Sequence, residues 1–510
     1  MKNTQKTKNV TLLVDGTVLK KHMLELGQNP TAQQIVQYLT HMVQVIHQQT
    51  PEAVVQIQYY GSRLTEVIAL PISGKPYTDP EIKLELKHSQ VPGAALQTNW
   101  GRASYPSDET WILKPDSYHK NNLTDADFVL NEKPKGVLAQ LVTKLADCVT
   151  KHLEEPVYVY GDTDDMAYAL HTAKWMGGEV YQVALNGKKP YVVDVPSAKE
   201  PRFCDKNNVL QIGQKLKDQQ DPAALLKQLR LQCNPKDRQS VLMVDVGVIR
   251  KYLDQHDCRM NLSNVQQVLD EITMSLPESP TKTVLYCAFA TPTKLVSPFP
   301  GEARALIDAS IDKQILSLPN VEFSAGKTIQ DKWYPAILKR DKWHTPASER
   351  GYRDFGYNFH QCDVDDRLIW DMYMCAQNPS VAQLYLVALD GDFAYPVELA
   401  AQMGLPTFLV QVDFGRKGLS HRLKGCVDAT LKIKPGTENL SSRTEEEEIK
   451  CSAQRVRCKK LQKMRKQWAK SAKEDMLPTP NREERWALQR LANKRQSRQR
   501  IVESRKQRSK

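Results

Sequence analysis

The sequence contains the same succession of segments twice. The run Leu-Leu-Val-Asp at 12–15 recurs as Leu-Met-Val-Asp at 242–245, and an amphipathic helical pattern follows each copy. Near the end of each copy, Met-Ala-Tyr at 166–168 recurs as Phe-Ala-Tyr at 393–395, with the same spacing to a Met-Gly pair. Several matches in the same order are not expected by chance. The chain is therefore predicted to be a tandem duplication of one domain.

Each copy alternates apolar strand-like runs with helical patterns. This alternation favours an α/β fold with two Rossmann-type domains, each with a mostly parallel sheet and helices on both faces. A length of 510 residues allows two or three units of ordinary domain size. The predicted boundaries are 1–195 for the first domain, 196–237 for a polar linker with a short helical piece, 238–435 for the second domain and 436–510 for a polar and then basic tail, helical or disordered.

The positive charge of the chain is concentrated in the tail. Residues 450–510 hold 21 Lys and Arg against 5 Asp and Glu, so this segment carries more than the whole net charge of +12, and the rest is mildly acidic. Clustered cations bind phosphates through counterion release, and tryptophan can stack on unpaired bases. RNA contact is the favoured interpretation; a solvated helix, a solubilising tail or a nuclear signal are alternatives. The candidate RNA-binding residues are Lys459, Lys460, Arg465, Lys466, Trp468, Trp486, Lys494, Arg495, Arg498 and Arg500.

Cysteine usage and hydropathy point to the cytoplasm. The ten cysteines are scattered singly, which favours neither a disulfide framework nor a zinc site. The sequence has no uncharged apolar run of about 18 residues and no signal-peptide core at its beginning. We therefore expect an unexported protein without a membrane partner.

Aspartates in the second copy lie where an open α/β sheet places its chemistry, at the carboxyl ends of strands. Asp245 ends the first strand, Asp390 and Asp392 end a later one, and Asp365 opens a helix between them. Asp371 is a less certain fifth member, because it could instead pair with Arg367 one helical turn earlier. Carboxylates brought together repel one another unless a cation neutralises them, so Mg²⁺ or Mn²⁺ is the expected cofactor.

Such a site suits phosphodiester chemistry, and no small-molecule cofactor is expected. The alternative for each single aspartate is a helix cap or a turn former. The set as a whole favours function. We predict that Asp245, Asp365, Asp390 and Asp392 are catalytic, and that the same four with Asp371 are metal ligands.

These residues resemble the pattern of the NYN domains, a family of PIN-like nucleases. That pattern has a strand ending in Asp-Gly, a mid-domain Val-Asp with a second Asp six residues later, and a strand ending in Asp-Ser-Asp-Phe. The second copy matches it at 245, 364–365, 371 and 390–393, and departs at Val246, where glycine is usual. The first copy resembles the family at 59–60, 71–74, 111–115, 123–124 and 135–137.

The acidic positions of the first copy depart from the family pattern. Leu138 and Lys144 stand where the mid-domain aspartates are expected, and alignment on Met166 puts Thr163 and Asp165 at the Asp-x-Asp positions. A shifted turn would instead use Asp162 and Asp164. A lysine among carboxylates competes with a cation. The first copy is therefore predicted to be degenerate, with Asp15, Asp162, Asp164 and Asp165 as the remaining acids.

The resemblance implies a metal-dependent ribonuclease with RNA as substrate. The leading hypothesis is an endoribonuclease in which the second domain cuts while the first domain and the tail position RNA. A non-catalytic RNA-binding adaptor is the alternative, since a fold alone does not establish activity. A phosphatase is less favoured, because the Asp-x-Asp-x-Thr strand end is missing. Endo- or exonucleolytic action, RNA preference, the number of metal ions and the oligomeric state stay open.

Overall fold

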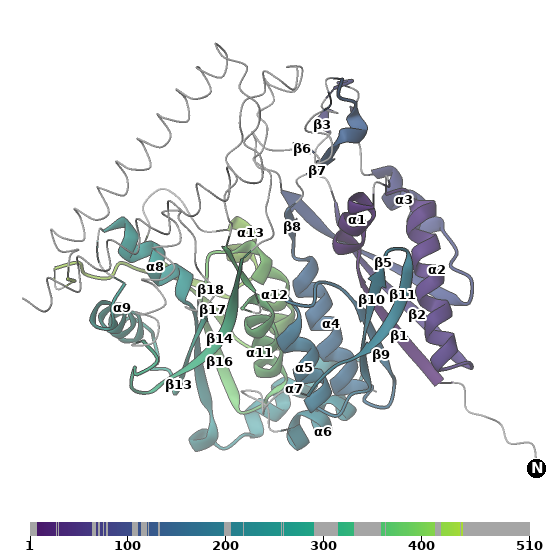
Figure 1. Cartoon of the computed structure of the whole chain (residues 1–510). Coiled ribbons are helices and arrows are strands. Elements are labelled where there is room, and N and C mark those ends of the chain that lie inside the picture. The colour runs from purple at the N-terminus through teal and green to yellow at the C-terminus, as the bar shows by residue number, and fades with distance from the viewer. Residues whose placement is uncertain are drawn as a thin grey trace, which may run out of the picture.

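The computed structural model describes residues 8–441, apart from gaps at 64–67, 105–110, 114–119, 198–205, 290–314, 331–358 and 414–419 and shorter gaps of one or two residues. Within this part the chain forms two sheets of seven strands each. Both sheets are mostly parallel, which confirms the predicted α/β class. Figure 1 shows the two sheets with helices between them and further helices on their outer sides.

The two sheets have equivalent strand orders, with the first strand of each repeat in the middle. The sheets differ at one edge, where β11 is antiparallel to its neighbour and β18 is parallel. The first sheet runs β11 (Lys189–Asp194), β10 (Val180–Asn186), β9 (Val157–Tyr160), β1 (Lys8–Asp15), β2 (Ala53–Arg63), β5 (Ala94–Ser104) and β8 (Lys133–Lys135). The second runs β15 (Phe359–Cys362), β14 (Val321–Gln330), β13 (Lys282–Phe289), β12 (Gln239–Asp245), β16 (Val381–Val387), β17 (Thr407–Val412) and β18 (Ala429–Ile433).

Helices cover both faces of each sheet. The first domain contains α1 (Gly16–Glu25), α2 (Ala32–Gln49), α3 (Pro80–His88), α4 (Val137–Lys151) and α5 (Ala167–Trp175), with the short ladders β3 (Ile68–Ala69) with β4 (Pro76–Tyr77) and β6 (Trp111–Leu113) with β7 (Phe128–Leu130). The second contains α8 (Val246–Gln255), α9 (Leu262–Met274), α11 (Asp365–Gln377), the 3₁₀ turn η6 (Gly391–Phe393), α12 (Ala394–Gln402) and α13 (His421–Gly425). No helix in the described ranges is long and apolar enough to cross a membrane.

Three apolar cores lie between the sheets and the helices that cover them. They form because the central strands carry apolar side chains on both faces. In β1, Leu12 and Val14 pack outward with α1 and α2, whereas Leu13 points to the middle of the molecule. In β12, Leu242 packs outward with α8 and α9, whereas Met243 points to the middle. The middle core contains side chains from both sheets. The two domains therefore share one hydrophobic core rather than meeting through a polar surface.

The equivalent helices of the two repeats meet in the middle core. Helix α4 packs against α11, and the contacts of α5 with α11 and of α12 with α4 are reciprocal. Buried polar groups cross this interface: the Tyr373 hydroxyl donates to Asp147 Oδ1 at 3.0 Å, and the backbone N–H of Ala169 donates to Asp366 Oδ2 at 3.1 Å. Figure 1 shows these helices between the two sheets. The duplication thus forms a pseudo-symmetric pair of domains.

Two helices between the domains pack against both. Helix α6 (Lys206–Lys217) approaches α4 so closely that a Cβ on Gly213 would lie 2.2 Å from the Thr150 carbonyl oxygen. Helix α7 (Pro222–Gln232) buries Arg230, whose guanidinium donates to the carbonyls of Val381, Ala376 and Met403. Two of these carbonyls lie at the ends of α11 and α12, where a cation is favoured by the helix dipole. The segment joining the domains is thus folded onto them.

A pair of positions explains why the second repeat has Val246 where the first repeat has Gly16. Gly16 is its equivalent in the first repeat, and a Cβ there would lie 2.1 Å from the Tyr59 ring. The sheet register pairs Val14 with Tyr59 and Val244 with Leu285, so a smaller side chain replaces the tyrosine in the second repeat. Val246 fills that space and is 2% exposed. The departure at this position is a compensated packing change.

Candidate active site

Three aspartates lie at the carboxyl ends of neighbouring central strands of the second sheet. Asp245 ends β12 and caps α8, with Oδ1 accepting from the backbone N–H of Gly247 at 2.8 Å. Asp390 and Asp392 follow β16, and Asp390 Oδ1 accepts from the backbone N–H of Asp392 at 3.2 Å. The glycine between them is needed, because a Cβ on Gly391 would lie 2.6 Å from Ser420 Oγ. Parallel strands end at one edge, which brings these carboxylates together.

Asp365 faces the same group from the first turn of α11. Its side chain reaches solvent, yet the surrounding protein desolvates the carboxylate. This desolvation, followed by repulsion from Asp245, Asp390 and Asp392, raises its pKa to about 7. Burial also raises the pKa of Asp245, with Asp390 adding to the effect and Lys251 opposing it. The four aspartates predicted to be catalytic are therefore electrostatic neighbours.

The first domain also reaches this site, which the sequence did not reveal. The backbone N–H of Gly136, at the N-terminal end of α4, donates to Asp392 Oδ1 at 2.9 Å. Gly136 has a φ of 78°, a left-handed conformation that favours glycine. Asp165 of the first domain is among the carboxylates that raise the pKa of Asp365. The site is therefore composite, with the second domain contributing four aspartates and the first a backbone donor and a fifth.

Asp371 lies away from these four aspartates, in the interface between the domains. It is fully buried, and its two oxygens accept from the hydroxyls of Tyr168 at 3.2 Å and Tyr286 at 2.8 Å. The Arg367 guanidinium lies 4.3 Å above the ring of Tyr168. These bonds satisfy the carboxylate where it stands. The structure thus does not bring Asp371 to the other four predicted metal ligands, and its contacts are those of an interface residue.

The acids of the first domain form a smaller group. Asp15 is buried and caps α1, accepting from the N–H groups of Thr17 at 2.8 Å and Val18 at 3.1 Å. Burial raises its pKa to about 6, and Asp162 and Asp165 add repulsion that these bonds oppose. Val14 pairs with Tyr160 as Val244 pairs with Val387.

By that register, Thr163 corresponds to Asp390 and Asp165 to Asp392. Asp162 accepts from the N–H of Asp164 at 2.9 Å and shapes the turn, while Asp164 is exposed. Leu138, at the position of Asp365, is half-buried against the middle core.

The chemistry of the second-domain group fits a divalent cation. Its donors are all carboxylate oxygens, and their mutual repulsion decreases when a cation binds. Within the described ranges, however, no three Asp, Glu, His or Cys side chains are arranged as a ready set of direct ligands. Mg²⁺ usually keeps several water ligands and needs only one or two carboxylates. Asp365 and Asp245 are the residues best placed to hold it, since repulsion from the group acts on both.

The candidate RNA-binding residues of the tail, from Lys459 to Arg500, lie outside the described residues. Among the described residues the basic groups nearest this site are few. Lys251 and Arg250 act on the charge of Asp245, and Arg422 Nη1 would lie 3.5 Å from a Cβ on Gly136. These three side chains place positive charge near the carboxylates.

Comparisons with known proteins supply no family. No protein-family model and no curated protein matches the chain. Among solved structures, a UDP-GlcNAc 2-epimerase from Methanocaldococcus jannaschii is 9% identical, with 84% of this chain and 90% of that chain covered and a TM-score of 0.19. The UDP-GlcNAc 2-epimerase from Neisseria meningitidis bound to UDP-GlcNAc is 10% identical, with 90% and 94% covered and a TM-score of 0.17. A phosphoglycerate kinase from Coxiella burnetii is 12% identical, with 84% and 92% covered and a TM-score of 0.16. Similarity at these scores carries no argument about fold or function.

Proposed function

We propose that this protein is a metal-dependent ribonuclease built from two NYN-type, PIN-like domains, and that the second domain cleaves RNA. One observation carries the proposal. Asp245 ends β12, Asp390 and Asp392 follow the adjacent strand β16, and Asp365 opens α11 beside them, so that desolvation by the surrounding protein and repulsion within the set raise the pKa of Asp365 to about 7. A group of carboxylates at the carboxyl edge of a parallel sheet is a costly arrangement unless a cation is bound there.

The residues of the site have separate tasks in this proposal. Asp365 and Asp245 hold the cation, Mg²⁺ or Mn²⁺, while Asp390 shapes the turn that presents Asp392. Gly136 fixes the orientation of the Asp392 carboxylate through its backbone N–H. When bound, the cation supplies Lewis-acid stabilisation of the charge that develops at a phosphodiester. The acidic set thus prepares the site, and the first domain positions one of its members.

A cleavage assay tests the proposal directly. Labelled single-stranded and structured RNA would be incubated with the full chain in Mg²⁺, in Mn²⁺ and in EDTA. We expect cleavage in either metal, none in EDTA, and loss of cleavage in Asp365→Asn. Internal fragments would indicate endonucleolytic action, and mononucleotides would indicate trimming from an end. Asp164→Asn is the matched control, because Asp164 is an exposed aspartate in the other domain. Cleavage that persists in EDTA and in Asp365→Asn would contradict the proposal.

A non-catalytic RNA-binding adaptor is the second candidate. It is favoured by the lack, within the described ranges, of a ready set of three metal ligands, and by the degenerate site of the first domain. The two candidates differ in the effect of metal on the protein. A ribonuclease of this type should be stabilised against heat by Mn²⁺ in a manner that requires Asp365. An adaptor would bind RNA with the same affinity in Mn²⁺ and in EDTA and would leave the RNA intact.

We also propose that the basic tail contributes to RNA binding. Its excess of cations would release counterions on binding, so affinity should fall steeply with salt. A chain ending at residue 449 should bind RNA more weakly and with a flatter salt dependence than the full chain. An unchanged slope would show that the tail does not contribute to RNA binding.

We also propose a cytoplasmic location, which cell fractionation would test. In a reducing compartment cysteines stay free, as in the described residues Cys148, Cys233, Cys258, Cys287, Cys375 and Cys426.

A further inference from the structure

A cavity of about 670 Å³ lies between the domains, away from the aspartates of the proposed active site. One wall is the inner face of β2 and β5, and the others are α4 from the first domain and α11 and α12 from the second. Cavities of about 300–1,000 Å³ are typical of small-molecule sites. None of the five aspartates of the proposed active site lines this one. The cavity is therefore separate from the proposed active site.

One buried polar atom in the cavity wall, the hydroxyl of Thr143, has no hydrogen-bond partner among the described residues, and Thr143 is 3% exposed. A buried hydroxyl without a partner costs about 1–3 kcal/mol, so such a group usually marks a position that a ligand or water fills. Tyr60 and Tyr395 line the cavity with aromatic rings, whereas the Trp100 ring packs on the outer face of the sheet against Tyr59. The wall thus combines an unsatisfied hydroxyl with aromatic surface.

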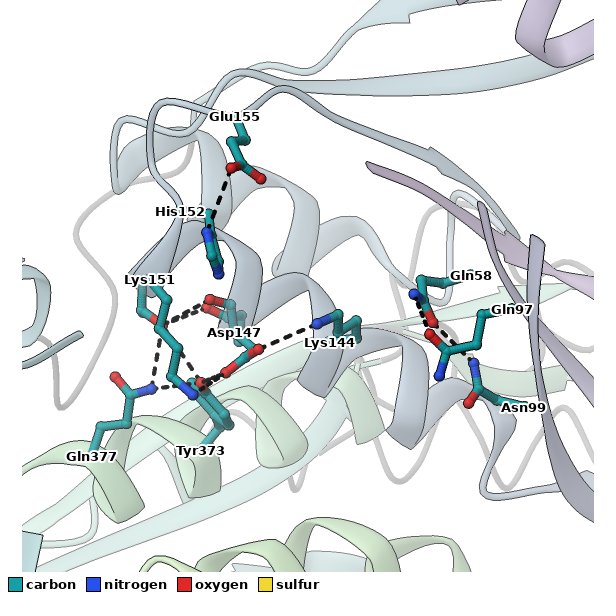
Figure 2. Close-up of polar contacts among 12 residues, drawn as sticks. Gln58, Gln97, Asn99, Lys144, Asp147, Lys151, His152, Glu155, Tyr373 and Gln377 are labelled. Carbon is teal, nitrogen blue, oxygen red and sulfur yellow. Dashed lines mark hydrogen bonds and ion pairs between the residues drawn. The ribbon is translucent and has the colours of Figure 1, made fainter. Parts of the chain in front are cut away.

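Three amide side chains form a continuous row on the sheet side of the cavity (Figure 2). The Gln58 amide nitrogen donates to the Gln97 oxygen at 2.8 Å, and the Asn99 amide nitrogen donates to the Gln58 oxygen at 3.2 Å. These bonds use the oxygen of Gln97 and one hydrogen of Asn99. The Gln97 nitrogen and the Asn99 oxygen therefore remain as a donor and an acceptor on the same face of one strand. A donor next to an acceptor complements the edge of a nucleobase.

The opposite side of the cavity is positively charged. Figure 2 shows Asp147 between Lys144 and Lys151, with ion-pair distances of 3.4 and 2.7 Å. Lys83 also lines the cavity, and Asp147 is the one carboxylate among the described lining residues. Burial opposes the charge on Lys144, but Cys148 and Asp147 raise the pKa of its ammonium, so it stays charged. Three lysines against one aspartate suit an anion of low charge, such as one phosphate group.

We propose that this interdomain cavity binds a nucleotide unit, with its base against Tyr60, Tyr395 and the amide row and its phosphate toward Lys144. Such a ligand would use the volume of the cavity, its aromatic surface, the neighbouring donor and acceptor, and the lysines. A purely apolar ligand would leave the amide row and Thr143 unsatisfied. An inorganic anion would leave most of the volume and the aromatic rings unused. The nucleotide could be free or the end of an RNA strand, since both present the same chemistry.

Isothermal titration of the full chain in EDTA tests this proposal with AMP and CMP as probes. We expect both to bind, and adenosine and inorganic phosphate to bind more weakly than AMP. Lys144→Gln should reduce affinity for AMP by about tenfold or more, the effect of one hydrogen bond to a charged group, and Asn99→Ala by about fivefold, the effect of one neutral hydrogen bond. Lys217→Gln is the matched control, because it breaks the Lys217–Glu154 ion pair outside the cavity. Melting temperatures would establish that every variant is folded.

Each result decides a part of the proposal. No binding of AMP or CMP at millimolar concentration would show that water alone occupies the cavity and would overturn it. So would an affinity that is unchanged in both variants, or phosphate binding as tightly as AMP. Displacement of AMP by a short RNA oligonucleotide would assign the site to strand ends, and a lack of displacement would assign it to free nucleotides; both agree with the proposal. Because metal is excluded, a failure here is distinct from a failure of the proposed cleavage.

Discussion

The two domains have equivalent sheets, but they use equivalent positions in opposite ways. Asp365 of the second domain belongs to a cluster of carboxylates, whereas its counterpart Leu138 in the first domain packs against the middle core. Asp371 accepts from two buried tyrosines, whereas its counterpart Lys144 pairs with Asp147 beside an open cavity. The duplicated framework has thus kept its packing while one copy concentrated acids and the other developed a basic cavity.

The comparison also shows that the two copies are not separate modules. The hydrogen bond from Gly136 to Asp392 and the repulsion between Asp165 and Asp365 both cross the domain boundary. The first domain, which lacks aspartates at 138 and 144, therefore contributes to the acidic site of its neighbour. In the proposed ribonuclease its task is to position that site.

The largest difference between the domains is expected in activity. In the proposed ribonuclease, Asp365→Asn should lower the cleavage rate by about a hundredfold or more, the usual range for removing one group that stabilises a transition state. Asp15→Asn should change the rate far less, because asparagine still caps α1 and the first domain lacks the other acids. Single-turnover cleavage of a labelled RNA measures both. Equal losses would refute the model with one active domain.

A second experiment addresses the contribution of the first domain to the site of the second. Gly136→Ala forces a side chain into a left-handed conformation and should displace the N–H that holds Asp392, with a loss of activity of about ten- to a hundredfold. Gly187→Ala is the control, since Gly187 has a φ of 58° in a hairpin where nothing lies within 4 Å of its Cβ. Similar activity in the two variants would mean that the bond from Gly136 is only structural.

A smaller effect, on the free energy of unfolding, is expected when Gly16 and Tyr59 of the first domain are replaced by their counterparts from the second. Gly16→Val should destabilise the protein by about 1–3 kcal/mol, because the new side chain overlaps the Tyr59 ring. Adding Tyr59→Leu, which copies Leu285, should recover part of that loss. Urea denaturation of the two single variants and the double variant measures the coupling. Strictly additive effects would contradict the compensation between these positions.

The smallest expected effect is the pH dependence of stability in EDTA. The pKa of Asp365 is raised to about 7 and that of Asp15 to about 6, so the folded protein binds more protons than the unfolded chain below these values. Each group therefore costs stability as pH rises from its ordinary pKa of 3.8 to its raised one. The melting temperature of Asp365→Asn minus that of wild type should therefore increase as pH rises to about 7 and then level off. For Asp15→Asn the same difference should level off at about pH 6.

Melting temperatures measured with Mn²⁺ would show which of the two domains binds the cation. It should raise the melting temperature of wild type and of Asp15→Asn at pH 7, and have little effect on Asp365→Asn. A stabilisation by Mn²⁺ that does not depend on Asp365 would place the cation elsewhere. A relative stability of Asp365→Asn that is flat with pH would show that its carboxylate is not strained by its neighbours.

The sequence by itself determined the α/β class, the repeated order of strands and helices and the proximity of four aspartates in the second repeat. Apolar runs such as 157–160 and 242–245 are too uniformly apolar for a half-exposed sheet, so they require helices on both faces. Parallel strands then need crossover helices, and such strands end at the same edge. The proximity of Asp245, Asp390 and Asp392 could be predicted because each follows the end of a strand, a property local in sequence.

Only the tertiary structure decided how the two copies combine. Asp371 fits the spacing of a metal ligand, but packing against Tyr168 of the other domain turned it into an interface residue. The sequence placed Asp165 and Gly136 in the pattern of the first copy, but it could not show that they reach the site of the second, because that depends on the approach of α4 and α5 to α11 and η6. The cavity beside Lys144 has the same origin. Contacts between distant segments are set by how two apolar faces pack, and that geometry is not encoded in the spacing of residues along either one.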